Sequence, residues 1–199
     1  MHLAIQWREE KMKNEPPTKP PDHSELERLK SLVIVNTGDG KGKSTSAFGV
    51  IFRALGRGWD VSVVQFIKSG KWETGETAMA KKLGVDWWEI GEGFTWDSSD
   101  LDEDQAVALE AWKQAGEIIN SGRKRLLVLD EITYPINWGW LSENEVIDAI
   151  RNRPEDMNII LTGRDASESL LQLSDIATEM KKVKHVYDEG VLAKKGIDY

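Results

Sequence analysis

The chain has 199 residues, of which 40% are hydrophobic, and a formal net charge of −8; this length and composition predict one soluble globular domain. The acidic balance argues against a nucleic-acid partner, because phosphate backbones are bound by basic surfaces. The lack of cysteine excludes a disulfide framework, a thiolate metal site and a cysteine nucleophile. No apolar run reaches the ~20 residues of a membrane span, and the N-terminus carries charges where a secretory segment is apolar, so we expect a cytoplasmic protein without membrane contact.

Residues 1–30 are predicted to form an N-terminal arm, separate from a functional domain at 31–199. The prolines clustered within residues 16–21 prevent regular structure there. Ser24 begins a capping pattern for a short helix before the first strand. The arm is therefore either a disordered tail or a segment that closes over a functional site.

The chain is organised around residues 32–45, where apolar residues run into a glycine-spaced turn that ends in Gly-Lys-Ser and opens a helix. The glycines let the backbone fold around an anion with its N–H groups inward, and the positive end of the helix faces the same point. Lys43 is expected to reach the terminal phosphates, and the Ser44 hydroxyl to bind Mg²⁺. The predicted nucleotide-binding residues of this loop are Thr37, Gly38, Asp39, Gly40, Lys41, Gly42, Lys43, Ser44 and Thr45.

The loop departs from the standard phosphate-loop spacing, because Thr37 stands where the first glycine is required and that glycine comes one residue late. A glycine-rich turn without a ligand is the alternative interpretation. This alternative does not explain why a strand, the glycine spacing, the Lys-Ser pair and a helix occur together in one stretch.

Beyond the loop, apolar residues at helical spacing alternate with short apolar runs. Helices are predicted at residues 43–55, 75–83, 102–121, 142–152 and 167–173, and strands at 32–35, 61–67, 85–90, 126–129, 158–161 and 176–182. This alternation predicts an α/β fold of three layers, a parallel sheet with helices on both faces, as in P-loop nucleotide-binding proteins. Right-handed crossovers then place the loop at the carboxyl edge of the sheet, where ligands bind.

A second chemical signal is the pair Asp130 and Glu131, which ends the apolar run at 126–129. A buried strand would deliver Asp130 to the carboxyl edge beside Ser44, and Mg²⁺ prefers hydroxyl, carboxylate and phosphate oxygens. The acids alone are a weak signal, since many buried strands end in an acid. Together with the loop they predict that the protein binds ATP–Mg²⁺.

Other residues at this edge leave two interpretations open. Arg53 and Arg164 are each either a phosphate ligand or a solvated surface arginine. Phe94 and Trp96 lie on a glycine-rich loop, where they either bind a large flat or apolar partner or pin the loop by packing within it. None of the three histidines has metal-ligand spacing.

Several stretches of the chain together resemble the phosphate-loop type of ATP:corrinoid adenosyltransferase of the cobalamin biosynthesis pathway. These stretches are residues 37–45, 64–68, 93–96, 129–134, 153–154, 161–164, 183–185 and 195–199. The resemblance covers about residues 31–199, and the late first glycine is the family's own loop pattern. It does not extend clearly to residues 1–30.

The resemblance implies transfer of the 5′-deoxyadenosyl group of ATP to the Co(I) of a reduced corrinoid, cob(I)alamin or a precursor, with release of triphosphate. The nucleophile is then the metal of the substrate, so the protein needs to hold the reacting atoms in line and to neutralise the leaving triphosphate. The resemblance makes Lys43 a catalytic residue and places Arg53 and Arg164 near the nucleotide. It places Asp130 and Glu131 at the metal ion, either Mg²⁺ or Mn²⁺.

The resemblance also implies that Phe94 and Trp96 bind the corrinoid and displace its lower axial ligand. It further implies a homodimer, an N-terminal segment that folds over the active site, and a flavoprotein-type reductant for cobalt. Two alternatives stay open. One is an ATPase or kinase of the same fold, in which Glu131 positions water. The other is a non-enzymatic nucleotide sensor that binds a protein through its aromatic loop.

Overall fold

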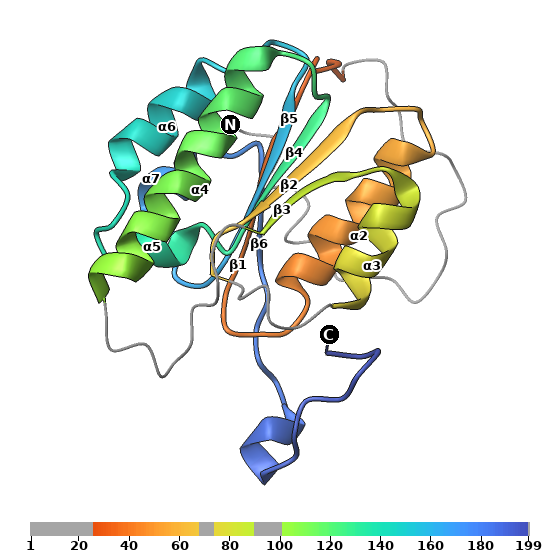
Figure 1. Cartoon of the computed structure of the whole chain (residues 1–199), viewed down its shortest axis with the longest axis vertical. Coiled ribbons are helices and arrows are strands. Elements are labelled where there is room, and N and C mark those ends of the chain that lie inside the picture. The colour runs from red at the N-terminus through yellow and green to blue at the C-terminus, as the bar shows by residue number, and fades with distance from the viewer. Residues whose placement is uncertain (1–25, 68–73, 90–100, 199) are drawn as a thin grey trace.

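The computed structural model describes residues 26–67, 74–89 and 101–198. Its parallel strands form one sheet in the order β3-β2-β4-β5-β1-β6, with helices on both faces (Figure 1). The strands are β1 (Val33–Thr37), β2 (Val61–Gln65), β3 (Asp86–Glu89), β4 (Leu126–Asp130), β5 (Asn158–Thr162) and β6 (Ile176–Glu179). The helices are α2 (Lys43–Leu55), α3 (Gly75–Leu83), α4 (Leu101–Ser121), α5 (Thr133–Asn137), α6 (Glu143–Arg151), α7 (Glu168–Leu173) and the 3-10 helix η1 (Val186–Glu189). The predicted three-layer α/β fold is confirmed.

The two faces of the sheet pack against different helices, because alternate side chains of a strand point in opposite directions. Leu127 and Leu129 of β4 belong to the core shared with α4, α5, α6 and α7. Leu126 and Val128 belong to the core shared with α2 and α3. Figure 1 shows these two helix groups on opposite sides of the sheet. Since β4 is covered on both faces, a run of four apolar residues is what this central strand requires.

The predicted helices and strands agree with the structure to within a few residues, with two differences. The short helix α5 was not predicted. Its Pro135 lies in the first turn, where a missing N–H breaks no helical hydrogen bond. The helix expected after Ser24 is wrong for residues 26–30, which are not helical. The rest of the predicted arm lies outside the described residues. Within the described ranges no helix is long and apolar enough to cross a bilayer.

The start of α6 offers a test of the local sequence signals. Ser142 precedes the helix, and its side-chain oxygen accepts a hydrogen bond from the backbone N–H of Glu145, at 3.4 Å. We predict that Ser142→Ala lowers the free energy of unfolding by about 1 kcal/mol, because that N–H loses its acceptor. Urea denaturation measures the change.

The matched control is Ser46→Ala, at an exposed position inside α2. Alanine favours the helix there, so stability should stay the same or rise slightly. A Ser142 variant as stable as the Ser46 variant would show that the cap contributes nothing.

Candidate functional site

The glycine-rich loop between β1 and α2 lies at the carboxyl edge of the sheet, as predicted (Figure 1). Gly38 and Gly42 have φ values of 93° and 118°, in the left-handed region that glycine adopts without strain. The Lys43 ammonium donates hydrogen bonds to the carbonyl oxygens of Gly38, at 2.6 Å, and Gly40, at 2.8 Å. Its positive charge is therefore held within the curve of the loop, at the N-terminal end of α2, where an anion is favoured.

The backbone that follows β6 packs directly against this loop. The N–H of Gly40 donates to the carbonyl oxygen of Met180, at 2.6 Å. A methyl group added at Gly38 or Gly40 would lie 2.6 or 2.7 Å from the same oxygen. The two glycines thus meet a packing requirement, and the chain after β6 is fixed at the edge of the loop.

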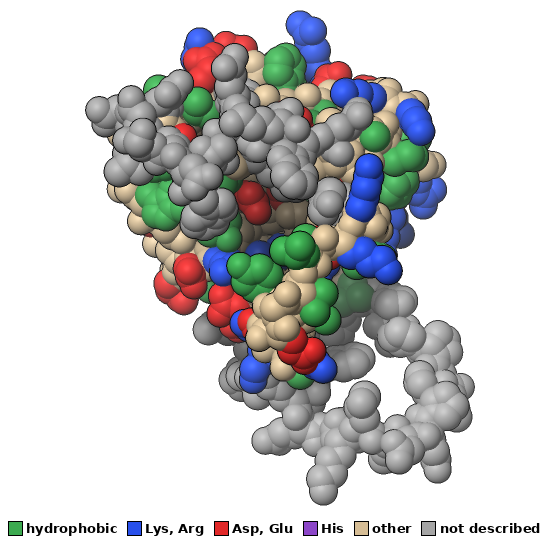
Figure 2. Space-filling view, turned by 60° about the horizontal axis from the view of Figure 1, so that its bottom comes forward, with side chains coloured by type: hydrophobic (Ala, Val, Ile, Leu, Met, Phe, Trp, Pro, Cys, Tyr) green, Lys and Arg blue, Asp and Glu red, His purple; other side chains and the backbone are tan. Residues whose placement is uncertain are grey.

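A polar cavity of about 380 Å³ opens beside the loop. In Figure 2, which looks toward this edge, acidic and basic side chains gather around a hollow. Its described lining residues are Asp39, Gly40, Lys41, Gly42, Lys43, Ser44, Thr45, Glu76, Glu131, Tyr134, Arg164, Lys182, His185, Tyr187, Asp188 and Asp198. The structure therefore brings most of the predicted loop together with Glu131 and Arg164.

Other predicted site residues are not among the described residues that line this cavity. The Thr37 hydroxyl accepts a hydrogen bond from the N–H of Ala166, at 3.1 Å, so it supports the loop from the side. Arg53 is exposed in the last turn of α2 and is not among the described lining residues. Phe94 and Trp96 lie outside the described residues.

Asp130 is completely buried behind the cavity. Its carboxylate oxygens accept hydrogen bonds from the Gln65 amide, at 2.8 Å, and the Thr162 hydroxyl, at 2.7 Å. The Gln65 carbonyl oxygen in turn accepts from the Trp87 indole N–H, at 3.0 Å. This chain of hydrogen bonds crosses the neighbouring strands β3, β2, β4 and β5. Such partners are needed, because a carboxylate removed from water without them is strongly destabilising.

Glu131, the next residue, leaves the strand and lines the cavity. Its φ of 64° is a left-handed value that is uncommon for a residue other than glycine. Its backbone N–H donates to the Thr162 hydroxyl oxygen, at 2.9 Å. Thr162 therefore holds both acids, donating to one side chain and accepting from the backbone of the other. The turn at Glu131 separates two carboxylates that are adjacent in sequence, with Asp130 in the core and Glu131 lining the same cavity as Ser44.

Burial changes the proton affinities of two groups in the cavity. It lowers the pKa of the Lys43 ammonium below the ordinary 10.5, and nearby Arg164 lowers this pKa further. Burial raises the pKa of the Tyr134 phenol above the ordinary 10.0. Tyr134 is therefore protonated at neutral pH and can donate a hydrogen bond to a ligand.

The segment after β6 supplies lining residues that the sequence analysis did not identify: Lys182, His185, Tyr187, Asp188 and Asp198. The Asp198 carboxylate pairs with Lys41 of the loop, at 2.7 Å, and accepts from the backbone N–H of Lys194, also at 2.7 Å. These two interactions, the backbone one first, hold the pKa of Asp198 below its ordinary value. The segment is irregular apart from η1, so no periodicity marked it. The available signals were the matching stretches at 183–185 and 195–199.

The fold and the cavity together define a class: a parallel α/β protein with a glycine-rich loop and a polar cavity at the carboxyl edge of its sheet. Comparison with known proteins identifies the family. The profile of the family described as ATP:corrinoid adenosyltransferase BtuR/CobO/CobP matches residues 29–199. The chain belongs to this family, and the resemblance seen in the sequence is confirmed.

Three relatives show how far the similarity extends. The Escherichia coli K12 protein named corrinoid adenosyltransferase is 41% identical over 170 residues, which cover 85% of this chain and 86% of that protein. The Salmonella typhimurium protein named corrinoid adenosyltransferase CobA is 39% identical over 176 residues, covering 88% and 89% of the two chains. The Pseudomonas aeruginosa corrinoid adenosyltransferase is 39% identical over 203 residues, covering 94% and 100%.

The double role of Thr162 leads to a prediction about stability. Thr162→Val keeps the shape of the side chain but leaves an Asp130 oxygen and the Glu131 N–H without their partner. Each unsatisfied buried group costs about 1–3 kcal/mol, so the free energy of unfolding should fall by at least that amount. Thr162→Ser keeps the hydroxyl and should restore most of the loss. Equal stability of the valine and serine variants in urea denaturation would contradict this account of the network.

Proposed function

We propose that the protein transfers the 5′-deoxyadenosyl group of ATP to the Co(I) centre of a reduced corrinoid and releases triphosphate. The observation that carries the proposal is the polar cavity beside the glycine loop, lined by Lys43, Glu131 and Arg164, in a chain of this family. The electron pair of Co(I) attacks C5′, the C5′–O bond breaks, and triphosphate leaves with the bonding electrons. The substrate's cobalt is the nucleophile, so the cavity has to supply charge stabilisation and alignment rather than a base.

In this proposal residues 38–45 and Arg164 bind the triphosphate. The Lys43 ammonium passes from the loop carbonyls, which are its present partners, to the phosphate oxygens. Thr37 acts through its support of the loop. A role for Arg53 stays a prediction from the family resemblance.

A divalent cation, Mg²⁺ or Mn²⁺, fits the same cavity. The Ser44 hydroxyl and the Glu131 carboxylate both line it, and these are oxygen donors of the kind that Mg²⁺ combines with substrate phosphates. Asp130 is the last residue of β4 and is not among the described lining residues; its hydrogen bonds to Gln65 and Thr162 hold it at the end of that strand. When bound, the cation neutralises charge on the leaving triphosphate.

The decisive experiment mixes the protein, ATP and chemically reduced cobalamin without oxygen. The new cobalt–carbon bond is followed by absorbance, and the phosphate products are separated by ion exchange. We expect triphosphate, released only when Co(I) corrinoid is present. Release of phosphate at a comparable rate without corrinoid would favour an ATPase. ATP binding with neither product would favour a nucleotide sensor.

Lys43→Ala should lower the rate of adenosylation by about 10²–10³, the usual effect of losing one group that stabilises developing charge. The control is Lys113→Ala, an exposed lysine on α4 whose partner is Glu110, and it should leave the rate unchanged. Similar rates for the two variants would show that the glycine loop is not the phosphate site.

We also propose that Phe94 and Trp96 fill the lower face of the corrinoid and exclude its lower axial ligand. A lower ligand donates into the cobalt orbital that accepts the incoming electron, so removing it makes reduction to Co(I) easier. Apolar rings can exclude both the ligand and water. The support for this role is the family resemblance of the loop.

Phe94→Ala and Trp96→Ala should therefore leave ATP affinity nearly unchanged and slow adenosylation most when cobalt starts as Co(II). The loss should shrink when Co(I) is supplied chemically, and also for a corrinoid that lacks the nucleotide base. Rates in the four combinations of cobalt state and corrinoid type measure the effect. Equal losses in all four would reduce these residues to general substrate contacts.

The remaining proposals concern location and partners. The family resemblance supports a homodimer, a flavoprotein-type reductant for cobalt and a cytoplasmic location. A second copy of the chain could also supply the segment that closes over the cavity, a role for which residues 1–30 are the candidate.

A further inference from the structure

We propose that Asn137, the last residue of α5, is a positioning residue for Arg164: its side-chain amide holds the turn after β5 so that the Arg164 guanidinium faces the triphosphate. The binding of triphosphate by Arg164 rests on the proposed function. The positioning role rests on hydrogen bonds, packing and backbone angles of the described residues. Asn137 itself is exposed and is not among the described residues that line the polar cavity.

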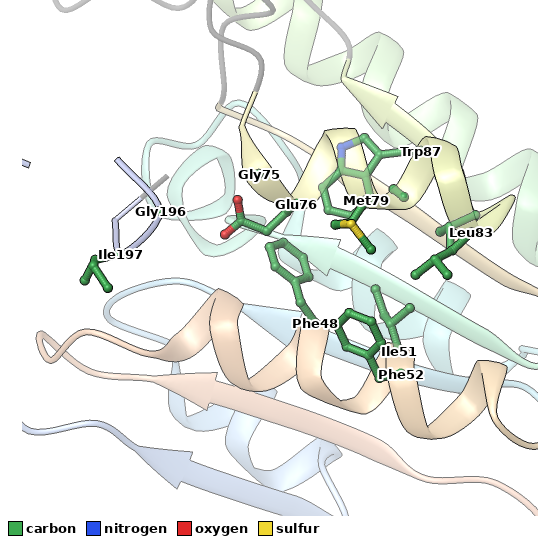
Figure 3. A pocket seen from close by; sticks show the side chains of 12 residues that line it. Phe48, Ile51, Phe52, Gly75, Glu76, Met79, Leu83, Trp87, Gly196 and Ile197 are labelled. Atoms are coloured by element: carbon green, nitrogen blue, oxygen red, sulfur yellow. The ribbon is translucent and has the colours of Figure 1, made fainter. Parts of the chain in front are cut away.

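The described walls of the polar cavity differ in what they offer to a polyanion. Helix α3 contributes Glu76, an acid that also lines a neighbouring apolar cavity of about 280 Å³. Figure 3 shows Glu76 at the edge of that cavity, with apolar side chains of α2 and α3 beside it. Arg164 instead brings positive charge from the turn after β5. Its orientation therefore affects how well a leaving triphosphate is neutralised.

The Arg164 side chain is weakly held in the structure. It is 52% exposed, and its Nε atom lies 4.0 Å from an Asp39 carboxylate oxygen, which is a long contact for an ion pair. Exposed ion pairs contribute little, because holding two mobile side chains together costs conformational entropy. The direction of the guanidinium therefore depends mainly on the backbone of the turn that carries it.

The backbone of this turn is unusual on both sides of Arg164. Gly163 has a φ of 142° and Asp165 a φ of 52°, both in the left-handed region, which is uncommon for a residue such as Asp165. Such conformations are costly and persist only where the surrounding structure holds them. A relaxation at Asp165 would rotate the adjoining peptide groups and turn Arg164 away from the cavity.

The short helix α5 lies against the turn at both of its ends. Thr133, its first residue, is completely buried, and a methyl group added at Gly163 would overlap the Thr133 hydroxyl. At the other end, the Asn137 Nδ2 atom donates to the carbonyl oxygens of Arg164, at 3.3 Å, and Asp165, at 3.2 Å. These carbonyls belong to the two peptide groups that flank Asp165. An amide that binds both of them fixes the left-handed conformation between them.

The same helix is joined to the acid on the other side of this edge. The Tyr134 N–H of α5 donates to the Glu131 carbonyl oxygen, at 3.3 Å. Helix α5 therefore connects the turn that carries Glu131 with the turn that carries Arg164, and both of these charged side chains line the polar cavity. A change at Asn137 loosens the Arg164 turn and leaves the Glu131 contact in place.

Two measurements on the full-length protein test the role of Asn137. One is the rate of adenosylation of chemically reduced cobalamin at saturating ATP. The other is calorimetric binding of the Mg²⁺ complex of inorganic triphosphate, which carries the charge that develops as the C5′–O bond breaks. Asn137→Ala should lower the rate and the affinity by about 3- to 10-fold each, as expected for lost hydrogen bonds. Asn137→Gln keeps the amide donors on a longer side chain and should recover part of both losses.

A double-mutant cycle with Arg164→Ala separates positioning from general support of the fold. Once Arg164 is absent, Asn137→Ala should change the rate and the triphosphate affinity by less than about 2-fold.

The matched control is Asn152→Ala. Asn152 is also an exposed asparagine at the end of a helix, and its amide donates to the Asp148 carbonyl oxygen, at 2.8 Å. It is not among the described residues that line the polar cavity. The alanine variants of Asn137 and Asn152 should lose similar stability in urea denaturation, but Asn152→Ala should keep the wild-type rate and affinity.

The outcomes separate this inference from the proposed function. If Lys43→Ala and Arg164→Ala both leave triphosphate affinity unchanged, the proposed phosphate site is wrong and the positioning role is overturned with it. If Lys43→Ala alone weakens binding, the glycine loop stands as the phosphate site and the inference about Arg164 is overturned. If Arg164→Ala weakens binding but Asn137→Ala behaves like Asn152→Ala, or its loss multiplies with that of Arg164→Ala, Asn137 does not act through Arg164, and the proposed function stands without it.

Discussion

The site depends on one buried carboxylate. Asp130 is tolerated in the core because Gln65 and Thr162 donate hydrogen bonds to its two oxygens. These donors end β2 and β5, the strands on either side of β4, so the same two bonds fix where three strands end relative to one another. Thr162 also accepts from the backbone of Glu131. The position of Glu131, which faces the cavity, therefore depends on the buried Asp130, because Thr162 is hydrogen-bonded to both residues.

Whether a feature of the fold or the site could be predicted from the sequence depends on how far apart along the chain its interacting residues lie. The alternation of helices and strands and the position of the glycine loop between a strand and a helix follow from local patterns, and the structure confirms them. The network around Asp130 could not be predicted, because Gln65 and Thr162 are ordinary strand residues until the order β2-β4-β5 makes them neighbours. The segment after β6 was missed for the same reason: its contacts with the loop join distant parts of an irregular chain. The position of Arg53 follows from helix geometry. Arg53 lies ten residues after Lys43, which is ~15 Å along the axis of α2. At that distance from the loop it is not among the described residues that line the polar cavity.

The glycine loop is constrained from two sides at once. In the proposed function its inner face presents N–H groups and the Lys43 ammonium to the triphosphate. On its outer face the Gly40 N–H donates a hydrogen bond to the Met180 carbonyl oxygen, at 2.6 Å. Side chains at Gly38 or Gly40 would meet that oxygen, so the glycine spacing serves packing as well as binding. The consequence is that β6 directs the following segment to the polar cavity, where Asp198 pairs with Lys41.

The charges of that cavity explain why a divalent cation belongs to the proposal. Among its described lining residues are four cationic side chains, Lys41, Lys43, Arg164 and Lys182, and five acids, Asp39, Glu76, Glu131, Asp188 and Asp198. The cations already have partners: Lys41 pairs with Asp198, Arg164 with Asp39 and Lys182 with Asp188, while Lys43 is bound to loop carbonyls. A triphosphate therefore meets no surplus of positive charge in this part of the chain. Its binding requires these cations to exchange partners, and it requires additional positive charge beside Ser44 and Glu131, which Mg²⁺ or Mn²⁺ would supply. In the proposed function Lys41 binds the triphosphate, so it would exchange Asp198 for phosphate oxygens, and the C-terminal segment would lose this contact with the loop.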